Sequence, residues 1–212
     1  MVSRMDVELI DTMGSDLTVV NSARVSFNKK KDQLDARDIR LISYLGKHKH
    51  ISPFGHCFAT FRCRAPIYVA RQLVKHKFLR WNEVSRRYVS EEPAFHMPVL
   101  RKAAKDKKQG SGEDLNNNIC DQVIRQACIE AGKQYTYLLK MGVCEEQARM
   151  ILPQNTMTEW YWSGSLDAFA DMVKLRIKED TQYGTQLIAK EISNCMRNSF
   201  PHSWDALTGS SS

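Results

Sequence analysis

Residues 71–88 read RQLVKHKFLRWNEVSRRY, and they are the most densely polar segment of the chain. These eighteen residues include six cations, one histidine and one glutamate, with a tryptophan and a tyrosine between them. Pro66 stands where a helix would start, and the pattern predicts a helix over 67–76. Because cations are favourable at a helix C-terminus, Lys75 and Lys77 alone need no functional explanation.

The second half of the segment is not explained by a helix end. It carries Asn82, Glu83, Ser85, Arg87 and Tyr88 within seven residues. Arginine offers a two-pronged donor to phosphate, and serine adds a neutral donor, so the pattern favours a bound polar anion. A solvated basic surface remains the alternative at this point.

Length, composition and charge limit the classes of protein that need to be considered. The chain has 212 residues, of which 42% are hydrophobic and 26% charged, as expected for one folded domain. An excess of 31 Lys and Arg over 24 Asp and Glu gives a net charge of +7, which favours an anionic partner. No run of about 18 apolar residues is present and the first residues lack an apolar signal core, so we expect an intracellular, cytoplasmic protein without a membrane span.

The order of the predicted elements indicates an α+β fold. Strands are expected at 7–10 and 56–64, and helices at 16–27, 35–46, 67–76, 119–139, 145–152, 165–178 and 181–198. Few strands among several helices, without βαβ regularity, predict a small, mixed, antiparallel sheet in a single domain over residues 1–212. Residues 101–118 break the composition with five cations, a Gly-Ser-Gly and three asparagines, and are expected to be a flexible basic excursion, either a plain loop tip or a loop that steers phosphate.

Several familiar kinds of site are disfavoured by the sequence. There is no G-x-G-x-x-G, no Walker loop and no G-x-S-x-G, which argues against Rossmann, P-loop and serine hydrolase sites. His48 and His50 alternate with lysines that would repel a cation, so no metal site is expected. None of the six cysteines forms C-x-x-C, and they are expected to be reduced, mostly buried thiols.

The 71–88 segment resembles the signature of the flavin-dependent thymidylate synthases. That signature is R-H-R, seven residues and a serine; here it reads Lys75-His76-Lys77, residues 78–84 and Ser85. Further similar stretches are residues 8–14, 23–27, 50–56, 65–72, 148–153 and 175–176. The resemblance covers nearly the whole chain, least of all residues 101–118.

The resemblance implies a fold, a reaction and an assembly. It implies an α+β subunit of a homotetramer that binds FAD and nucleotide where subunits meet. The reaction implied is reductive methylation of dUMP to dTMP, with methylenetetrahydrofolate as carbon donor and NADPH as reductant. Reduced flavin supplies the hydride, and no enzyme cysteine attacks the pyrimidine.

The resemblance also assigns roles to individual residues. FAD contacts are implied for Ser52, Lys75, His76, Lys77, Asn82, Glu83, Ser165 and Asp171. Contacts to the nucleotide are implied for Gln72, Lys75, Glu83, Ser85, Arg86, Arg87, Arg149 and Arg176. Arg176 would face the pyrimidine and act catalytically, since a positive charge there favours the ionised, more nucleophilic base.

The chain departs from the family pattern at several of these positions. Both arginines of R-H-R are lysines, which keep the charge and lose the planar fork. Other departures fall at Gly55, Ser165, Asp167, Asp171 and Gly184. Asp167 replaces an arginine, so it reverses charge beside an anionic cofactor and suggests altered flavin binding.

Two alternative functions stay open on the sequence. The first is hydroxymethylation of dUMP or dCMP with the same folate and flavin, because an added carboxylate such as Asp167 also suits the amino group of cytosine. The second is a basic nucleic-acid-binding module in which Trp81 and Tyr88 stack on bases. Nucleic acid is the less favoured partner.

Overall fold

A four-stranded antiparallel sheet forms the centre of the molecule. In the computed structural model, which describes residues 2–105 and 110–209, its strand order is β2-β3-β6-β4. The strands span β2 (Asp6–Met13), β3 (Phe58–Pro66), β6 (Met157–Ser165) and β4 (Arg80–Glu83). β3 and β6 pair over their full length, from Phe58 opposite Ser165 to Pro66 opposite Met157.

One face of the sheet carries the core. Side chains of β6 alternate, so that Trp160 and Trp162 are buried while Tyr161 between them is exposed, as the two-residue period of a strand requires. Phe61 on β3 and Phe169 pack edge to face with ring centroids 5.1 Å apart. Each such buried side chain contributes about 1.5–3 kcal/mol to folding.

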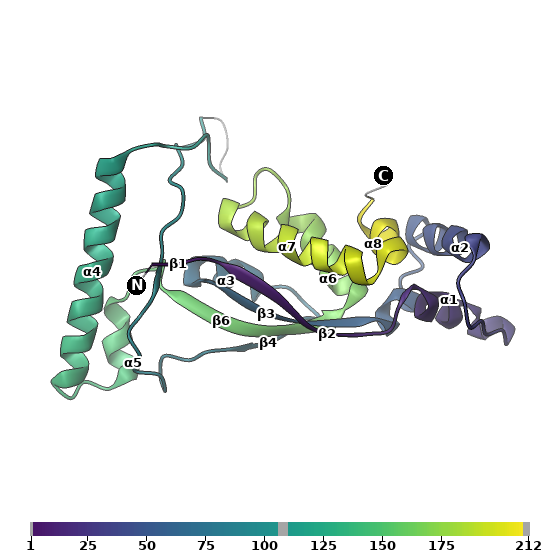
Figure 1. Cartoon of the computed structure of the whole chain (residues 1–212), viewed down its shortest axis with the longest axis horizontal. Coiled ribbons are helices and arrows are strands. Elements are labelled where there is room, and N and C mark those ends of the chain that lie inside the picture. Colours follow the sequence, from purple (N-terminus) through teal and green to yellow (C-terminus); the bar gives the residue numbers. More distant parts are fainter. Residues whose placement is uncertain (1, 106–109, 210–212) are drawn as a thin grey trace.

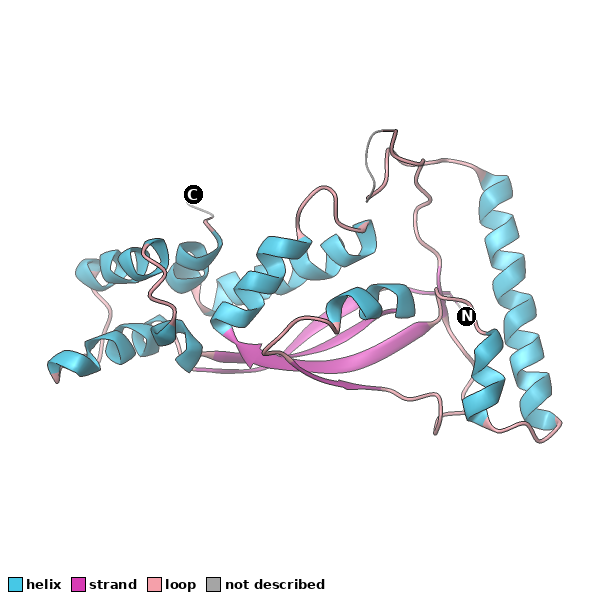
Figure 2. Cartoon of the chain, turned by 180° about the vertical axis from the view of Figure 1, so that it is seen from behind, coloured by secondary structure: helices cyan, strands magenta, loops and turns pink. Residues whose placement is uncertain are grey.

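Helices cover this face, and the opposite face is polar. The covering elements are α3 (Ile67–Leu73), α6 (Leu166–Arg176) and α7 (Tyr183–Ser199), as Figures 1 and 2 show. On the other face Arg62 lies between Glu159 and Glu8, at 2.8 and 3.7 Å. The sheet is thus covered by helices on one side.

The remaining elements lie at the two ends of the sheet (Figure 1). At one end are α1 (Asp16–Arg24), η1 (Val25–Phe27), α2 (Ala36–Lys47), η2 (Ser52–His56) and α8 (Pro201–Thr208). At the other end are α4 (Asn118–Lys140), α5 (Glu145–Ala148), η3 (Arg149–Ile151) and a small parallel pair, β1 (Val2–Ser3) with β5 (Phe95–His96). Asp16 accepts hydrogen bonds from the backbone N–H groups of His202 and Ser203, which satisfies the start of α8.

The predicted fold class is confirmed: helices accompany an antiparallel sheet in one domain. The element at 67–76 ends earlier than expected, at Leu73, and the sequence pattern did not reveal β4, β6 and α8. In the described part of the chain, no helix is long and apolar enough to cross a membrane. Four residues of the predicted excursion, 106–109, lie outside the described residues.

Candidate functional site

An arginine–histidine pair joins the end of α6 to the segment that follows α3. Arg176, the last residue of α6, donates from Nε to Nε2 of His76 over 2.8 Å. A guanidinium can only donate, so Nε2 of His76 is the unprotonated acceptor and Nδ1 carries the hydrogen. Burial, and secondly the charge of Arg176, lower the pKa of His76 to about 4. His76 is therefore neutral at physiological pH.

Gln72 completes this arrangement. Its backbone oxygen accepts from Nη2 of Arg176 over 3.0 Å, and its side-chain Oε1 accepts from the hydroxyl of buried Thr185 over 3.1 Å. Because Oε1 of Gln72 is bonded to Thr185, the orientation of the amide is fixed and its nitrogen can donate to a ligand. A polar cavity of about 370 Å³ adjoins the group and is lined by Gln72, Gly110, Arg176, Asp180, Thr181 and Gln182.

The described part of the basic excursion reaches this cavity. Backbone hydrogen bonds run from Lys102 to Glu113, from Gly112 to Lys102 and from Leu115 to Leu100, which pairs residues 100–102 with 112–115 as an antiparallel ribbon. Arg101 holds it through Ser111 at 2.7 Å and through the ring of Tyr183, 4.5 Å from its guanidinium carbon. Arg101 thus ties the ribbon to Tyr183 at the start of α7, and Gly110, which adjoins the ribbon, lines the same cavity as Arg176.

A second group of predicted residues lies around the end of β4. Glu83 accepts from Thr158 at 2.7 Å and from the indole of Trp81 at 3.0 Å. Ser85 accepts from both the backbone and Nε of Arg87, each over 3.3 Å. Its neighbour Arg86 lies over the ring of Tyr135 in α4, and Arg149 bonds to the backbone of Glu146.

A third group lies where η2 meets the start of α6. Ser52 opens η2, and Ser165 directly precedes α6. Asp167 lies beside Gly55: a Cβ at Gly55 would be 3.9 Å from Oδ1 of Asp167. That oxygen is buried and has no hydrogen-bond partner. Asp171 faces outward and pairs with Lys174 at 2.9 Å.

The other predicted cofactor contacts are open to solvent. Lys75 and Lys77 are exposed on either side of half-buried His76, and Asn82 is exposed in β4 opposite Tyr161. One chain therefore brings Gln72, His76 and Arg176 together by direct contact, and it holds Ser85, Arg87 and Arg149 in separate local bonds near α4.

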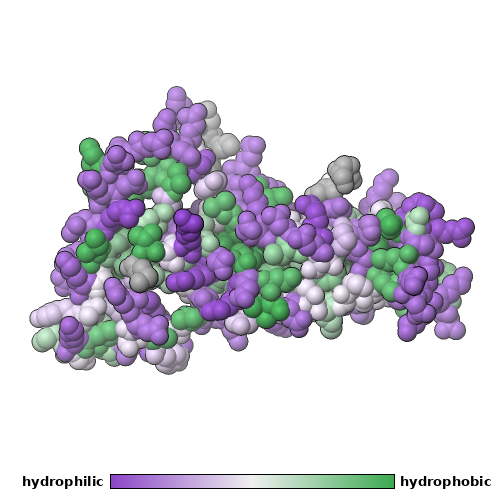
Figure 3. All heavy atoms as spheres, viewed as in Figure 1, coloured by the Kyte–Doolittle hydropathy of each residue, from purple (hydrophilic) through white to green (hydrophobic). Residues whose placement is uncertain are grey.

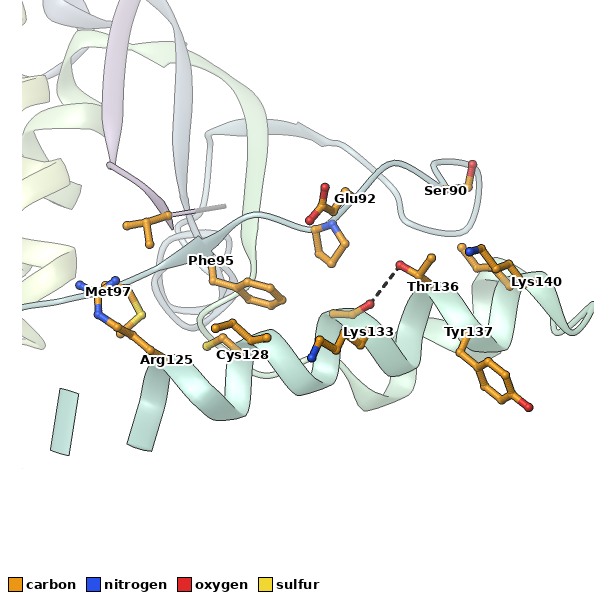
Figure 4. A pocket seen from close by; sticks show the side chains of 15 residues that line it. Ser90, Glu92, Phe95, Met97, Arg125, Cys128, Lys133, Thr136, Tyr137 and Lys140 are labelled. Atoms are coloured by element: carbon orange, nitrogen blue, oxygen red, sulfur yellow. Dashed lines mark hydrogen bonds between the residues drawn. The ribbon is translucent and has the colours of Figure 1, made fainter. Parts of the chain in front are cut away.

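A larger cavity lies elsewhere. It measures about 830 Å³ and lies between α4 and the segment around β5, with Phe95, Cys128, Lys133 and Tyr137 in its lining (Figure 4). None of the predicted site residues lines it. Its lining is mainly apolar, and its charged members, Glu92, Arg125, Lys133 and Lys140, lie outside the signature segment, so the candidate site is the Arg176 group.

Sequence reasoning did not identify Thr158 and Thr185, which orient Glu83 and Gln72. Neither threonine has a local signal, because each contacts a residue far away in the chain. The cysteines are unpaired, and Cys57, Cys63 and Cys128 are buried. No cluster of three potential metal ligands occurs among residues 2–105 and 110–209.

Comparisons with known proteins agree with the resemblance. The profile of the family described as "Thymidylate synthase complementing protein" matches residues 8–202. A flavin-dependent thymidylate synthase of Thermus thermophilus is 37% identical over 201 residues, covering 94% of this chain and 74% of the relative. One from Thermotoga neapolitana is 36% identical, covering 94% and 89%.

A solved structure is similar over its whole length. The UMP/dUMP methylase PolB from Streptomyces cacaoi, bound with 5-Br dUMP, superposes with a TM-score of 0.86 at 30% sequence identity, covering 98% of this chain and 96% of that one. The family profile, the relatives and the solved structure thus all indicate the same family. The chain belongs to the flavin-dependent thymidylate synthase family and is a methyltransferase.

Proposed function

We propose that the protein methylates C5 of dUMP to give dTMP. The observation that carries this proposal is Arg176, which is held by His76 and by the backbone of Gln72 at the edge of a polar cavity. A guanidinium fixed in this way stabilises the negative charge that develops on the pyrimidine as its C5 attacks a carbon electrophile. The solved relative PolB, named as a UMP/dUMP methylase, supports uracil as the base.

The proposed reaction replaces the C5–H bond of uracil with C5–CH₃. Methylenetetrahydrofolate provides the carbon, and NADPH is the ultimate source of the two electrons. Arg176 and the amide of Gln72 face the base; Lys75, Ser85, Arg86, Arg87 and Arg149 provide cationic and hydroxyl donors for the phosphate, and Glu83 is an acceptor. Burial raises the pKa of Cys57 to about 11, so this thiol is protonated at neutral pH and is a poor nucleophile.

The residues at the start of α6 fit a flavin. The space beside Gly55 is open apart from Oδ1 of Asp167, and this buried oxygen lacks a donor. Flavin side-chain hydroxyls and the adenine amino group can donate to it, whereas a diphosphate would be repelled. We therefore assign the diphosphate of FAD to Lys75 and Lys77, with Ser52, His76, Asn82, Glu83, Ser165 and Asp171 as further contacts. When bound and reduced, the flavin supplies the hydride.

We also propose that the active unit is a homotetramer with sites shared between subunits. Within one chain, Arg87 and Arg149 bond locally near α4, and neither is bonded to the Arg176 group on α3 and α6. In addition, α4 exposes Ile119, Val123, Ile129 and Tyr137 to more than half of their full extent. Figure 3 shows apolar groups among hydrophilic ones at this end of the molecule. Such surface is typical of subunit contacts.

Product analysis tests the function. The protein is incubated with FAD, NADPH, methylenetetrahydrofolate and dUMP, and the nucleotide product is identified by mass spectrometry. We expect a 5-methyl product. A 5-hydroxymethyl product, or product from dCMP alone, would replace the proposal with the hydroxymethylase, and an unchanged nucleotide would contradict both.

Subunit mixing tests the shared site. Arg176→Ala and Arg87→Ala chains are each expected to be inactive, and co-expression should restore part of the activity, because some sites then combine two intact halves. Light scattering should give the mass of a tetramer. If all residues of a site come from one chain, the mixture stays as inactive as its components.

A further inference from the structure

Glu83 is held at both carboxylate oxygens. Oε1 accepts from the hydroxyl of Thr158 over 2.7 Å, and Oε2 accepts from Nε1 of Trp81 over 3.0 Å. The two donors come from different strands, β6 and β4. Glu83 itself stays exposed, so its orientation is determined while its carboxylate remains open to a ligand.

The residues that hold Glu83 are themselves fixed. Trp81 stacks on Trp160 with ring centroids 4.3 Å apart and 17° between the planes, and meets Trp162 edge to face at 5.5 Å. Trp160 and Trp162 are each 1% exposed, and Thr158 is buried beside them. Trp81 and Glu83 are two residues apart in β4, so their side chains lie on the same face of the sheet.

A carboxylate in this arrangement is a directed acceptor. Each oxygen has two lone-pair positions, of which one is occupied, so one per oxygen is left for a ligand. The donors that dUMP offers are the ring N3–H and the 3′-hydroxyl, whereas its phosphate is repelled by a carboxylate. A glutamate side chain normally loses conformational entropy when it binds a ligand. Here Glu83 has already lost that entropy in the folded protein, so binding costs less.

We propose that Trp81 and Thr158 are positioning residues, which hold Glu83 as a fixed acceptor for an N–H or O–H donor of the pyrimidine nucleotide. This inference rests on the proposed function. It adds Trp81 and Thr158 as residues that affect nucleotide binding only by orienting Glu83. Neither threonine nor tryptophan needs to touch the nucleotide.

Matched substitutions separate this role from a structural one. Trp81→Phe keeps a ring on Trp160 and removes only the N–H, and Thr158→Val keeps the shape and removes only the hydroxyl. Trp160→Phe is the control, because the indole N–H of Trp160 is buried without a partner and serves no carboxylate. If core packing alone mattered, this fully buried position would be the most damaging of the three.

The readout is the dissociation constant of dUMP, measured by calorimetry, together with kcat and KM. We expect Trp81→Phe and Thr158→Val each to weaken dUMP binding about tenfold, as for loss of a hydrogen bond to a charged group. Thr158→Ser should restore it, and Trp160→Phe should leave it within about twofold while lowering the melting temperature.

A double-mutant cycle gives the decisive outcome. In a Glu83→Ala background, Trp81→Phe and Thr158→Val should have no further effect on dUMP binding. Full effects in that background, or wild-type affinity in both single variants, would overturn the inference and leave the proposed function intact. A wild-type protein that neither binds nor converts dUMP would refute the proposed function itself. Because the two variants lie on different strands, misfolding of one leaves the other as the test.

Discussion

Nε of Arg176 donates to Nε2 of His76 over 2.8 Å, so the imidazole is neutral and carries its hydrogen on Nδ1. Nη2 of Arg176 is engaged by the backbone of Gln72, which leaves Nη1 for a ligand. A single half-buried pair thus determines both the direction of the Arg176 guanidinium and the tautomer of His76. His76, the central histidine of the signature segment, thus holds Arg176, which lies 100 positions away in the chain.

Arg176→Ala should abolish turnover without releasing the flavin. The physical reason is that Arg176 lines the cavity that we assign to the pyrimidine. Although Arg176 bonds to His76, the residues to which we assign the diphosphate of FAD, Lys75 and Lys77, are unchanged in this variant. Arg176→Lys should recover only part of the rate, since lysine keeps the charge and loses the fork that engages His76 and Gln72 together. Steady-state kinetics and the flavin absorbance after gel filtration measure the two effects; wild-type turnover by Arg176→Ala would disprove the assignment.

The stability of the protein should fall in mild acid partly because of His76. Its pKa is about 4 in the folded chain, against an ordinary value of 6.5. Between these values the unfolded chain binds a proton that the folded chain does not, so the free energy of unfolding decreases as the pH falls through this window. His76→Gln keeps an acceptor and does not titrate. Thermal unfolding from pH 7 to pH 4 should therefore show a smaller loss of stability in acid for the variant, and equal losses would argue against a neutral, half-buried imidazole.

Single replacement of each of the six cysteines by alanine should leave the chemistry intact. Burial raises the pKa of the thiols of Cys57, Cys63 and Cys195, which keeps them protonated at neutral pH. Cys63→Ala is expected to cost about 1 kcal/mol of stability, as is common for a core substitution. The check is turnover together with retained flavin; a folded, flavin-loaded variant without activity would show that a cysteine participates.

Gly110→Ala should weaken dUMP binding, and Gly142→Ala should not. Both glycines have positive φ, 84° and 87°, so both replacements carry a similar backbone strain of roughly 1–2 kcal/mol. A Cβ at Gly110 would come within 3.3 Å of the backbone of Asp180 and would displace the ribbon from the cavity, whereas Gly142 has nothing within 4 Å. Equal dUMP affinities for the two variants would mean that the ribbon does not shape the site.

Patterns of local sequence predicted most of the helices and the signature segment. After Asp35, apolar residues recur at every third position, at Ile39, Ile42 and Leu45, which predicts a helix. The side chain of Asp35 accepts hydrogen bonds from the backbone N–H groups of Arg37 and Asp38 at the start of α2, as expected for a helix cap. The local sequence gives a weaker signal for β6, in which buried Trp160 and Trp162 alternate with the more exposed Glu159, Tyr161 and Ser163 over only nine residues. Such strand signals are short and are easily overlooked beside long helices.

The contacts that build the site could not be predicted in the same way. Thr185 reaches Gln72 across 113 positions of the chain, and Arg176 reaches His76 across 100. Nothing in the composition around either residue indicates its partner, since these bonds exist only after α6 and α7 have packed on the sheet. The adjacency of Gly55 and Asp167, both departures from the family pattern, likewise emerged only from the structure.

The most direct test of a flavin enzyme that acts on dUMP is the visible absorption spectrum of the protein loaded with FAD, titrated separately with dUMP and dCMP. We predict that the flavin band is retained after gel filtration and is perturbed by dUMP, because the nucleotide and the cofactor share one site. Loss of the flavin band under all conditions, or perturbation by dCMP alone, would contradict the proposed function.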